Sequence, residues 1–197
     1  MCYHIPMKSD QKYAIMTVGK THSGKTTFAR RLAKELPNFE ILEADPIAAF
    51  LGNNFPKLKA LDKLKTNEDI ADPKLKFILF RDMIAYALKG GLNLVLCNGN
   101  LIERMRSDTA AMVRKHSYAL IGVYFNYPES LLRERIAASD RSKDVLNLSR
   151  SFEEVLDRQN GVFQLPSPDE FDHFFEVKHP DELPAIEQKL IELMYQK

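Results

Sequence analysis

The chain has 197 residues, of which 45% are hydrophobic and 28% are charged, the balance of a globular protein with one buried core. Its net charge of +1 excludes a global field that would gather nucleic acid or anionic membranes, so such binding would need a local basic patch. Only two cysteines and no long apolar run predict a cytoplasmic protein without a membrane helix, and the length predicts one domain over residues 1–197.

Hydrophobic periodicity and helix-breaking residues divide the chain into alternating strands and helices. The predicted strands are 13–18, 39–44, 92–97, 119–125 and 171–177, and the predicted helices are 26–36, 56–65, 74–88, 101–116, 129–138 and 184–195. Strands that alternate with helices in this way form a parallel sheet covered on both faces, which predicts a three-layer α/β fold. The remaining parts of 46–72 and the arginine-rich stretch 141–158 show no regular pattern.

The loop between the first strand and the first helix matches the phosphate-binding pattern G-x-x-x-x-G-K-[ST]. It consists of Gly19, Lys20, Thr21, His22, Ser23, Gly24, Lys25 and Thr26, followed by Thr27. A plain glycine turn would not need the Gly-Lys-Thr triplet at this spacing, whereas a nucleotide site does. The backbone N–H groups would surround phosphate oxygens of ATP, Lys25 would reach the β- and γ-phosphates, and Thr26 would offer its hydroxyl to Mg²⁺.

Other nucleotide-binding classes lack their signatures in this chain. GTPases need N-K-x-D and D-x-x-G, and neither string occurs. Oligomeric and transporter ATPases usually carry an acid at the tip of a hydrophobic strand, whereas the third and fourth predicted strands lead into Asn98 and Asn126. Small P-loop kinases remain. Without that acid, the metal would rest on Thr26, the phosphates and water, with Asp45 as a further candidate.

The motifs together resemble the P-loop kinases grouped with the polynucleotide-kinase 5′-phosphotransferase domain, gluconate kinase, chloramphenicol phosphotransferase and the zeta toxins, small ATP-binding domains of the AAA type. The matching features are the P-loop, Asp45 after the second strand, the Leu-Ile-Glu-Arg-Met-Arg stretch at 101–106, and Pro128-Glu129 before an arginine-bearing lid at about 138–165. We therefore expect the P-loop NTPase fold, with a five-stranded parallel sheet in the order 2-3-1-4-5.

The resemblance and the chemistry of phosphoryl transfer suggest roles for particular side chains. Asp45 is the best placed carboxylate to orient and deprotonate the acceptor, unless it only caps the turn at Pro46 or holds metal-bound water. The resemblance implies that Arg104 and Arg106 bind the acceptor, although either could face water on such a helix. Asn100 is a further candidate for a hydrogen bond to the acceptor.

The lid is the expected source of a catalytic arginine, because a guanidinium can grip two oxygens of the transferred phosphate. We select Arg141 and Arg158 for this role, with an ordinary surface position as the alternative for each. The segment at about 46–72 is expected to face the acceptor. The lysines at 57–65 within it form either a solvated face or a positive rim on the substrate side.

These features predict an ATP- and Mg²⁺-dependent kinase that phosphorylates a hydroxyl on a small-molecule or nucleotide-like acceptor. One alternative is a 5′-hydroxyl polynucleotide kinase, which would use the lysines at 57–65 with Phe50 and Phe55 along a nucleic-acid strand. The other alternative is a nucleotide-binding regulator that closes on its ligand and signals to a partner without transferring phosphate.

Overall fold

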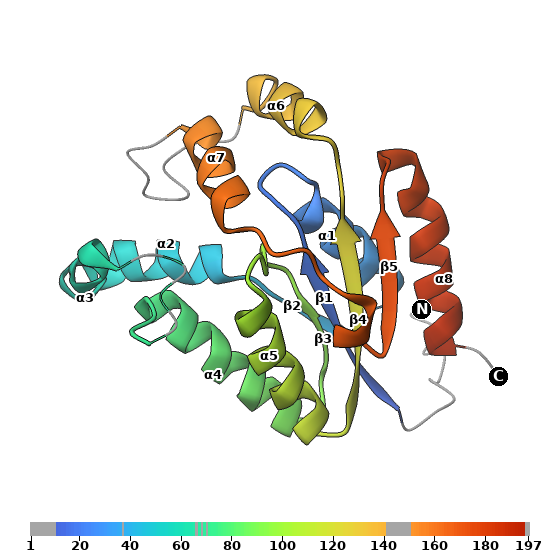
Figure 1. Ribbon diagram of the computed structural model, residues 1–197. Helices are drawn as coiled ribbons and strands as arrows, with labels where there is room; N and C mark the ends of the chain where they lie inside the picture. Colours follow the sequence, from blue (N-terminus) through green and yellow to red (C-terminus); the bar gives the residue numbers. More distant parts are fainter. Residues whose placement is uncertain are drawn as a thin grey trace.

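Five strands form one parallel sheet in the order β2-β3-β1-β4-β5 (Figure 1). The computed structural model describes residues 11–36, 38–65, 67, 69, 71–140 and 151–195. The strands are β1 Lys12–Val18, β2 Phe39–Leu42, β3 Asn93–Leu96, β4 Tyr118–Phe125 and β5 His173–Val177. The sequence-based prediction of the α/β fold and of the strand order is therefore confirmed.

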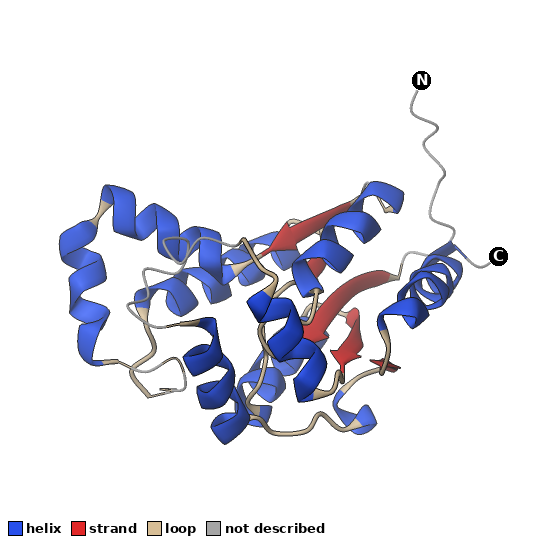
Figure 2. Ribbon diagram, turned by 90° about the horizontal axis from the view of Figure 1, so that it is seen from above, coloured by secondary structure: helices blue, strands red, loops and turns tan. Residues whose placement is uncertain are grey.

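Helices cover both faces of the sheet, as the view from above in Figure 2 shows. They are α1 Lys25–Glu35, α2 Ala44–Asn54, α3 Pro56–Ala60, α4 Leu75–Lys89, α5 Glu103–Lys115, α6 Glu129–Ala137, α7 Phe152–Val162 and α8 Leu183–Tyr195, with short 3₁₀ turns η1 Leu61–Leu64, η3 Pro168–Glu170 and η4 Pro180–Glu182. Helices α6 and α7 lie above the carboxyl ends of the strands (Figure 1). Among the described residues, no helix combines the length and apolar character needed to span a bilayer.

Strand β1 is the centre of the core because both of its faces are covered. Tyr13 and Ile15 point into one hydrophobic cluster, which includes residues of α1 and α8. Ala14 and Met16 point into the other cluster, which includes residues of α4 and α5. Successive side chains of a strand alternate between faces, so an uninterrupted apolar run is required here. Burial on both sides fixes the carboxyl end of β1, from which the glycine-rich loop departs.

Two helices of the structure lie where the sequence shows no regular pattern. Helix α2 contains Gly52 with two asparagines at its end, residues of low helix propensity, and it is stabilised instead by burying Ala48 and Leu51 next to α4. Helix α7 begins with a capping box, in which Ser151 and Glu154 bond to each other's backbone N–H. Tertiary packing and capping thus decide both segments.

Gly122 in β4 is the position where the packing leaves no room for a side chain. A Cβ built on Gly122 would lie 2.7 Å from the ring of Phe171, which is buried and stacked on Phe174. We expect Gly122→Ala to lower the free energy of unfolding by about 1–3 kcal/mol through overpacking, as measured by urea denaturation.

Gly161→Ala is the matched control for this substitution. A Cβ on Gly161, in α7, would meet no atom within 4 Å, so the alanine should raise the free energy of unfolding by about 0.5–1 kcal/mol through its better helix propensity. Equal effects of the two substitutions would contradict the packing described at Gly122.

Candidate functional site

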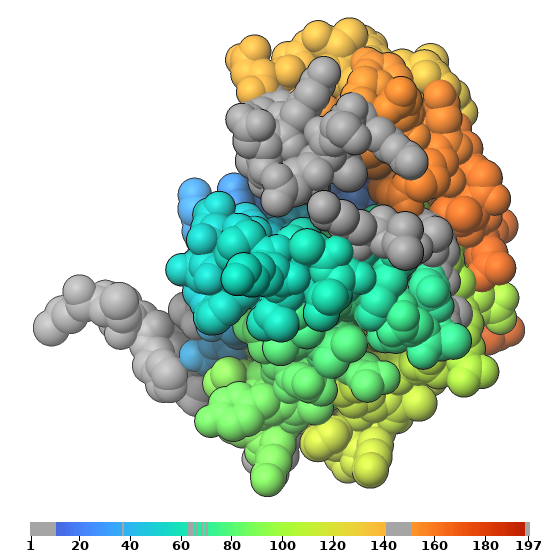
Figure 3. Space-filling view, turned by 90° about the vertical axis from the view of Figure 1, so that its left-hand side faces the viewer, coloured from blue at the N-terminus to red at the C-terminus, as the bar shows by residue number. Residues whose placement is uncertain are grey.

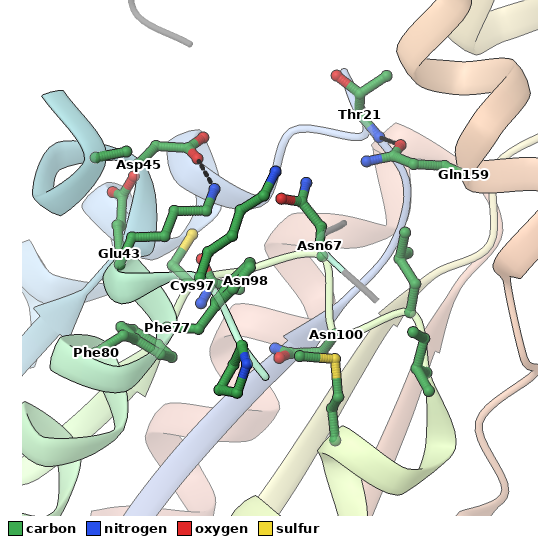
Figure 4. A pocket seen from close by; sticks show the side chains of 18 of the residues that line it. Thr21, Glu43, Asp45, Asn67, Phe77, Phe80, Cys97, Asn98, Asn100 and Gln159 are labelled. Carbon is green, nitrogen blue, oxygen red and sulfur yellow. Dashed lines mark hydrogen bonds and ion pairs between the residues drawn. The ribbon is translucent and has the colours of Figure 1, made fainter. Parts of the chain in front are cut away.

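A cavity of about 1210 Å³ lies at the carboxyl ends of β1, β2 and β3. Most of the P-loop lines it on one side, and residues of α2, α4 and α7 line it on others. In the close view of Figure 4, Asp45 and Glu43 lie on one side of this cavity, with Thr21 and Gln159 on the opposite side. Open α/β sheets bind ligands at this edge, so the cavity is the candidate active site.

The P-loop has the conformation of a phosphate cradle. Gly24 adopts a φ of 90° directly before α1, a left-handed conformation that favours glycine. The Nζ atom of Lys25 donates hydrogen bonds to the carbonyl of Lys20 at 2.6 Å and to the hydroxyl of Ser23 at 3.0 Å. The lysine thus lies across the loop, where the positive N-terminal end of α1 adds to its charge.

Two side chains from the region of the lid contact the P-loop directly. The Oε1 atom of Gln159, on α7, accepts a hydrogen bond from the backbone N–H of Thr21 at 2.6 Å. The Nη1 atom of Arg135, on α6, donates to the carbonyl of His22 at 3.2 Å. The guanidinium of Arg135 also lies 5.0 Å from the centre of the Tyr127 ring. Sequence reasoning selected neither Gln159 nor Arg135 for the site.

The arginines of the lid region therefore separate into different environments. Arg158 lines the cavity, as the sequence predicts for a lid arginine, and Arg135 lines it as well. Arg133 instead forms ion pairs with Glu129 and Asp157 at the surface. Arg141 lies outside the described residues, so its role stays a prediction. Arg133 and Arg135 are two residues apart on one helix, and only their positions in space distinguish them.

Strand β2 ends at Leu42 and α2 begins at Ala44, so Asp45 lies in the first turn of α2. Its carboxylate forms an ion pair with Nζ of Lys76 at 3.5 Å, drawn as a dashed line in Figure 4. The Lys76 side chain is only 14% exposed, and burial lowers the pKa of its ammonium group. The charge of Asp45 opposes this shift, whereas Lys59 and Arg158 lower the pKa of Lys76 further.

Glu43 is an acidic residue of the site that the sequence analysis missed. It directly follows β2 and lines the cavity, where its charge acts on the thiol of Cys97. Burial first, and then Glu43, raise the pKa of that thiol, so Cys97 is a neutral core residue. The Cys97 sulfur lies 3.7 Å from the hydroxyl of Thr26. The sequence signal that could have identified Glu43 is its position at the end of a strand, two residues before Asp45.

Two side chains of the cavity carry oxygen atoms of the kind that bind Mg²⁺ in proteins. The hydroxyl of Thr26 and the carboxylate of Glu43 are hard ligands that line one cavity. No group of three or more His, Cys, Asp or Glu side chains within the described ranges could hold a metal by itself. The protein would therefore supply one or two ligands, and phosphates and water would complete the shell, as is common for Mg²⁺ at phosphate sites.

A model of the AAA domain family matches residues 15–166. The chain belongs to the AAA domain family. A search of curated protein sequences finds no match for it. The family and the observed sheet order agree with the resemblance to P-loop kinases drawn from the sequence.

Solved structures share the fold of this AAA domain at low sequence identity. A gluconokinase from Sinorhizobium meliloti is 16% identical with a TM-score of 0.55, over 94% of this chain and 96% of that one. Kti12 from Chaetomium thermophilum, in complex with ADP-AlF3, is 17% identical with a TM-score of 0.57, over 92% and 98%. A fungal RNA kinase is 19% identical with a TM-score of 0.58, over 92% of this chain and 44% of its own.

Two asparagines of the AAA domain hold the strand tips together. The Oδ1 atom of Asn98 accepts a hydrogen bond from the backbone N–H of Ala44 at 3.1 Å and so positions the start of α2, next to Asp45. Asn100 lines the cavity, where the sequence predicts contact with the acceptor. Its Nδ2 atom donates to the carbonyl of Thr17 at 2.7 Å, so this amide also ties the loop after β3 to β1.

The two arginines at the start of α5 do not line the cavity. Arg104 is 71% exposed and pairs with Asp108 on its own helix. Arg106 is 1% exposed, and its guanidinium donates to both carboxylate oxygens of Glu170, at 2.6 and 2.9 Å. It also donates to the carbonyls of Asn100 and Gln164. This placement differs from the expectation that at least one of these arginines binds the acceptor: Arg104 faces solvent, which was the alternative for either residue, and Arg106 anchors the backbone.

We expect Arg106→Met to lower the free energy of unfolding by about 3–5 kcal/mol, because it leaves Glu170 and two carbonyls without their buried donor. Arg104→Met, an exposed position on the same helix, should change it by less than about 0.5 kcal/mol. Urea denaturation of both variants measures the difference. Similar stabilities would contradict the anchoring role of Arg106.

The same pair predicts a dependence on pH. Burial raises the pKa of the Glu170 carboxyl, but hydrogen bonds from Arg106 and from the Ser167 N–H outweigh it, so the folded-state pKa is lowered. A lowered folded-state pKa gives stability above the unfolded pKa that is lost as the pH falls. The stability difference between wild type and Arg106→Met should therefore shrink in acid.

Proposed function

We propose that this AAA domain is an ATP-dependent kinase that transfers the γ-phosphoryl group to a hydroxyl of a small-molecule or nucleotide-like acceptor. The observation that carries the proposal is that one cavity is lined by P-loop residues that include Lys25 and by Asp45 from the first turn of α2. Phosphoryl transfer to an alcohol needs a triphosphate site and a proton acceptor in this arrangement. The descriptions of the neighbouring structures as a gluconokinase and an RNA kinase support this class of reaction.

The nucleotide would bind with its phosphates on the P-loop. Backbone N–H groups of residues 19–27 and the amino end of α1 would surround the phosphate oxygens, and Lys25 would exchange its bonds to Lys20 and Ser23 for the β- and γ-phosphates. Arg135, which already contacts the loop at His22, would lie beside the nucleotide. Mg²⁺, held through Thr26 and Glu43, would neutralise charge on the β- and γ-phosphates.

In the reaction, the acceptor oxygen attacks the γ-phosphorus in line with the bridging oxygen that leaves with ADP. A new oxygen–phosphorus bond forms, the bond to the bridging oxygen breaks, and the acceptor proton passes to Asp45. The ion pair with Lys76 holds Asp45 in place, and Arg158 stabilises the charge that develops on the transferred group. In this proposal the lid is the segment at about 138–165, of which 141–150 lie outside the described residues, and the described part of about 46–72 forms the acceptor side.

A transfer assay with labelled ATP tests this function. The acceptor panel should include alcohols, sugars, nucleosides and single-stranded oligonucleotides. A phosphorylated product above background hydrolysis is the expected result, and no product from any acceptor would favour a nucleotide-binding regulator.

One observation favours the polynucleotide-kinase alternative. Phe50, within α2, and Phe55, between α2 and α3, are 54% and 46% exposed and could stack with bases. A steep loss of oligonucleotide affinity with salt would promote that alternative.

Asp45→Asn removes the proposed proton acceptor while keeping the size of the side chain. We expect kcat to fall by about 10²- to 10⁴-fold, the usual worth of a general base, with the affinity for ADP unchanged within a few-fold. Asp82→Asn, at an exposed position of α4, is the matched control and should keep full turnover. A rate for Asp45→Asn close to that of wild type would remove Asp45 as the base.

Arg158→Met removes the cavity arginine of α7. We expect kcat to fall by about 10³-fold or more while ADP binding changes little, because the guanidinium acts on charge that exists only during transfer. Arg133→Met removes a surface arginine of the neighbouring helix and should leave kcat unchanged. Equal losses of turnover and ADP affinity in Arg158→Met would show a binding role instead.

A further inference from the structure

We propose that the acceptor carries an anionic group, a phosphate or a carboxylate, and that Lys76 and Lys59 bind this group at the acceptor side of the cavity, next to Arg158. This inference rests on the proposed kinase function and adds the substrate class to it. The three cations come from different elements, α3, α4 and α7, and all three line the cavity.

The three cations form one electrostatic cluster. Lys59 and Arg158 line the same cavity as Lys76, and the charges of both lower the pKa of the Lys76 ammonium. Figure 3 shows the elements that carry them on one face of the molecule, with the α2–α3 segment in cyan, α4 in green below it and α7 in orange above it. The carboxylate of Asp45, which has the opposite charge, lies 3.5 Å from the Nζ atom of Lys76.

Three other carboxylates that line the cavity contact the backbone or a different arginine. Both oxygens of Asp62 accept from the backbone N–H of Leu75 at 3.1 Å and so cap α4. Asp108 pairs with Arg104. Asp69 accepts from the N–H of Asp72. Asp45 is therefore the carboxylate that the structure places in contact with Lys76.

The position of Lys76 shows why an anion fits this part of the cavity. The Lys76 side chain is 14% exposed, and its ammonium lies 3.5 Å from the carboxylate of Asp45. Lys59 and Arg158 add two further positive charges to the lining of the same cavity. An anionic group on the acceptor would be attracted to all of these charges, and partial exclusion of water would strengthen that attraction.

The same cations could instead serve only the γ-phosphate of ATP, and kinetics separate these two roles. A γ-phosphate role predicts that the loss of Lys59 slows transfer to every acceptor equally. An acceptor-anion role predicts a rise of KM that is confined to charged acceptors. Matched pairs of alcohols that differ in charge are the appropriate probes: glycerol with glycerol 3-phosphate, glucose with gluconate, and adenosine with adenosine 3′-phosphate.

For the wild type, we expect that in at least one pair the charged acceptor has a kcat/KM about tenfold or more above that of its neutral partner. Lys59→Met should raise the KM of that acceptor about tenfold or more and leave its neutral partner unchanged. Lys76→Met also loses the ion pair that holds Asp45, so it should slow transfer to both acceptors and in addition raise the KM of the charged one. Lys89→Met, at the far end of α4, removes the same charge and should have no effect. Equal use of charged and neutral acceptors by the wild type, or an equal loss for both in Lys59→Met, would overturn the proposal.

A binding measurement tests the site without any turnover. With the P-loop filled by a non-hydrolysable ATP analogue and Mg²⁺, inorganic phosphate or malonate should raise the Tm of the wild type in a concentration-dependent and saturable way. Phosphate alone or malonate alone would identify the class of anion. Lys76→Met and Lys59→Met should each lose most of the shift while they retain affinity for the analogue.

The two proposals fail separately in these experiments. Anion binding that depends on Lys76 and Lys59, in a protein that phosphorylates no acceptor, would support the site and contradict the kinase function. Absence of a Tm shift in the wild type, or a shift of equal size in both variants, would overturn the anion site even if neutral acceptors are phosphorylated.

Discussion

The pairing of β1 with β3 and β4 is the constraint on which the rest of this structure depends. β1 is buried on both faces, and its parallel register with β3 and β4 brings the P-loop, Cys97 and Asn98 to the same edge of the sheet. The N–H of Gly19 then donates to the carbonyl of Gly99 at 2.9 Å. Burial of apolar surface supplies the stability, and these few polar bonds at the strand tips set the positions of the chemical groups.

The strand-tip asparagines occupy positions where oligomeric and transporter ATPases usually place an acid. Asn98 uses its amide oxygen to hold the first N–H of α2, and this bond positions Asp45 relative to the P-loop. A carboxylate at position 98 could accept the same hydrogen bond, but it would add a charge beside Glu43. Of the groups that follow these two strands, the acidic ones, Glu43 and Asp45, come after β2, and those directly after β3 are neutral.

The sequence predicted the elements that depend on local pattern, and it missed those that depend on tertiary contacts. The P-loop and the alternation of strands and helices follow from spacing and periodicity, whereas the sheet order follows from the resemblance to P-loop kinases and the choice of Asp45 follows in part from it. Helix α2 was missed because its propensity is poor and its packing on α4 is not visible in the sequence. In the sequence, Arg106 resembles an acceptor ligand. Only the fold shows that its guanidinium donates hydrogen bonds to Glu170, 64 residues further along the chain.

Helix α7 connects the two ends of the cavity through consecutive residues. Gln159 accepts from the Thr21 N–H of the P-loop, while Arg158 acts on Lys76 at the acceptor side. Under the proposed function, a phosphate oxygen that takes the Thr21 N–H must displace the Gln159 carbonyl, and this displacement would shift the helix that carries Arg158. Nucleotide binding and the charge around the acceptor are then coupled through one rigid helix, because α7 cannot move one residue without the other.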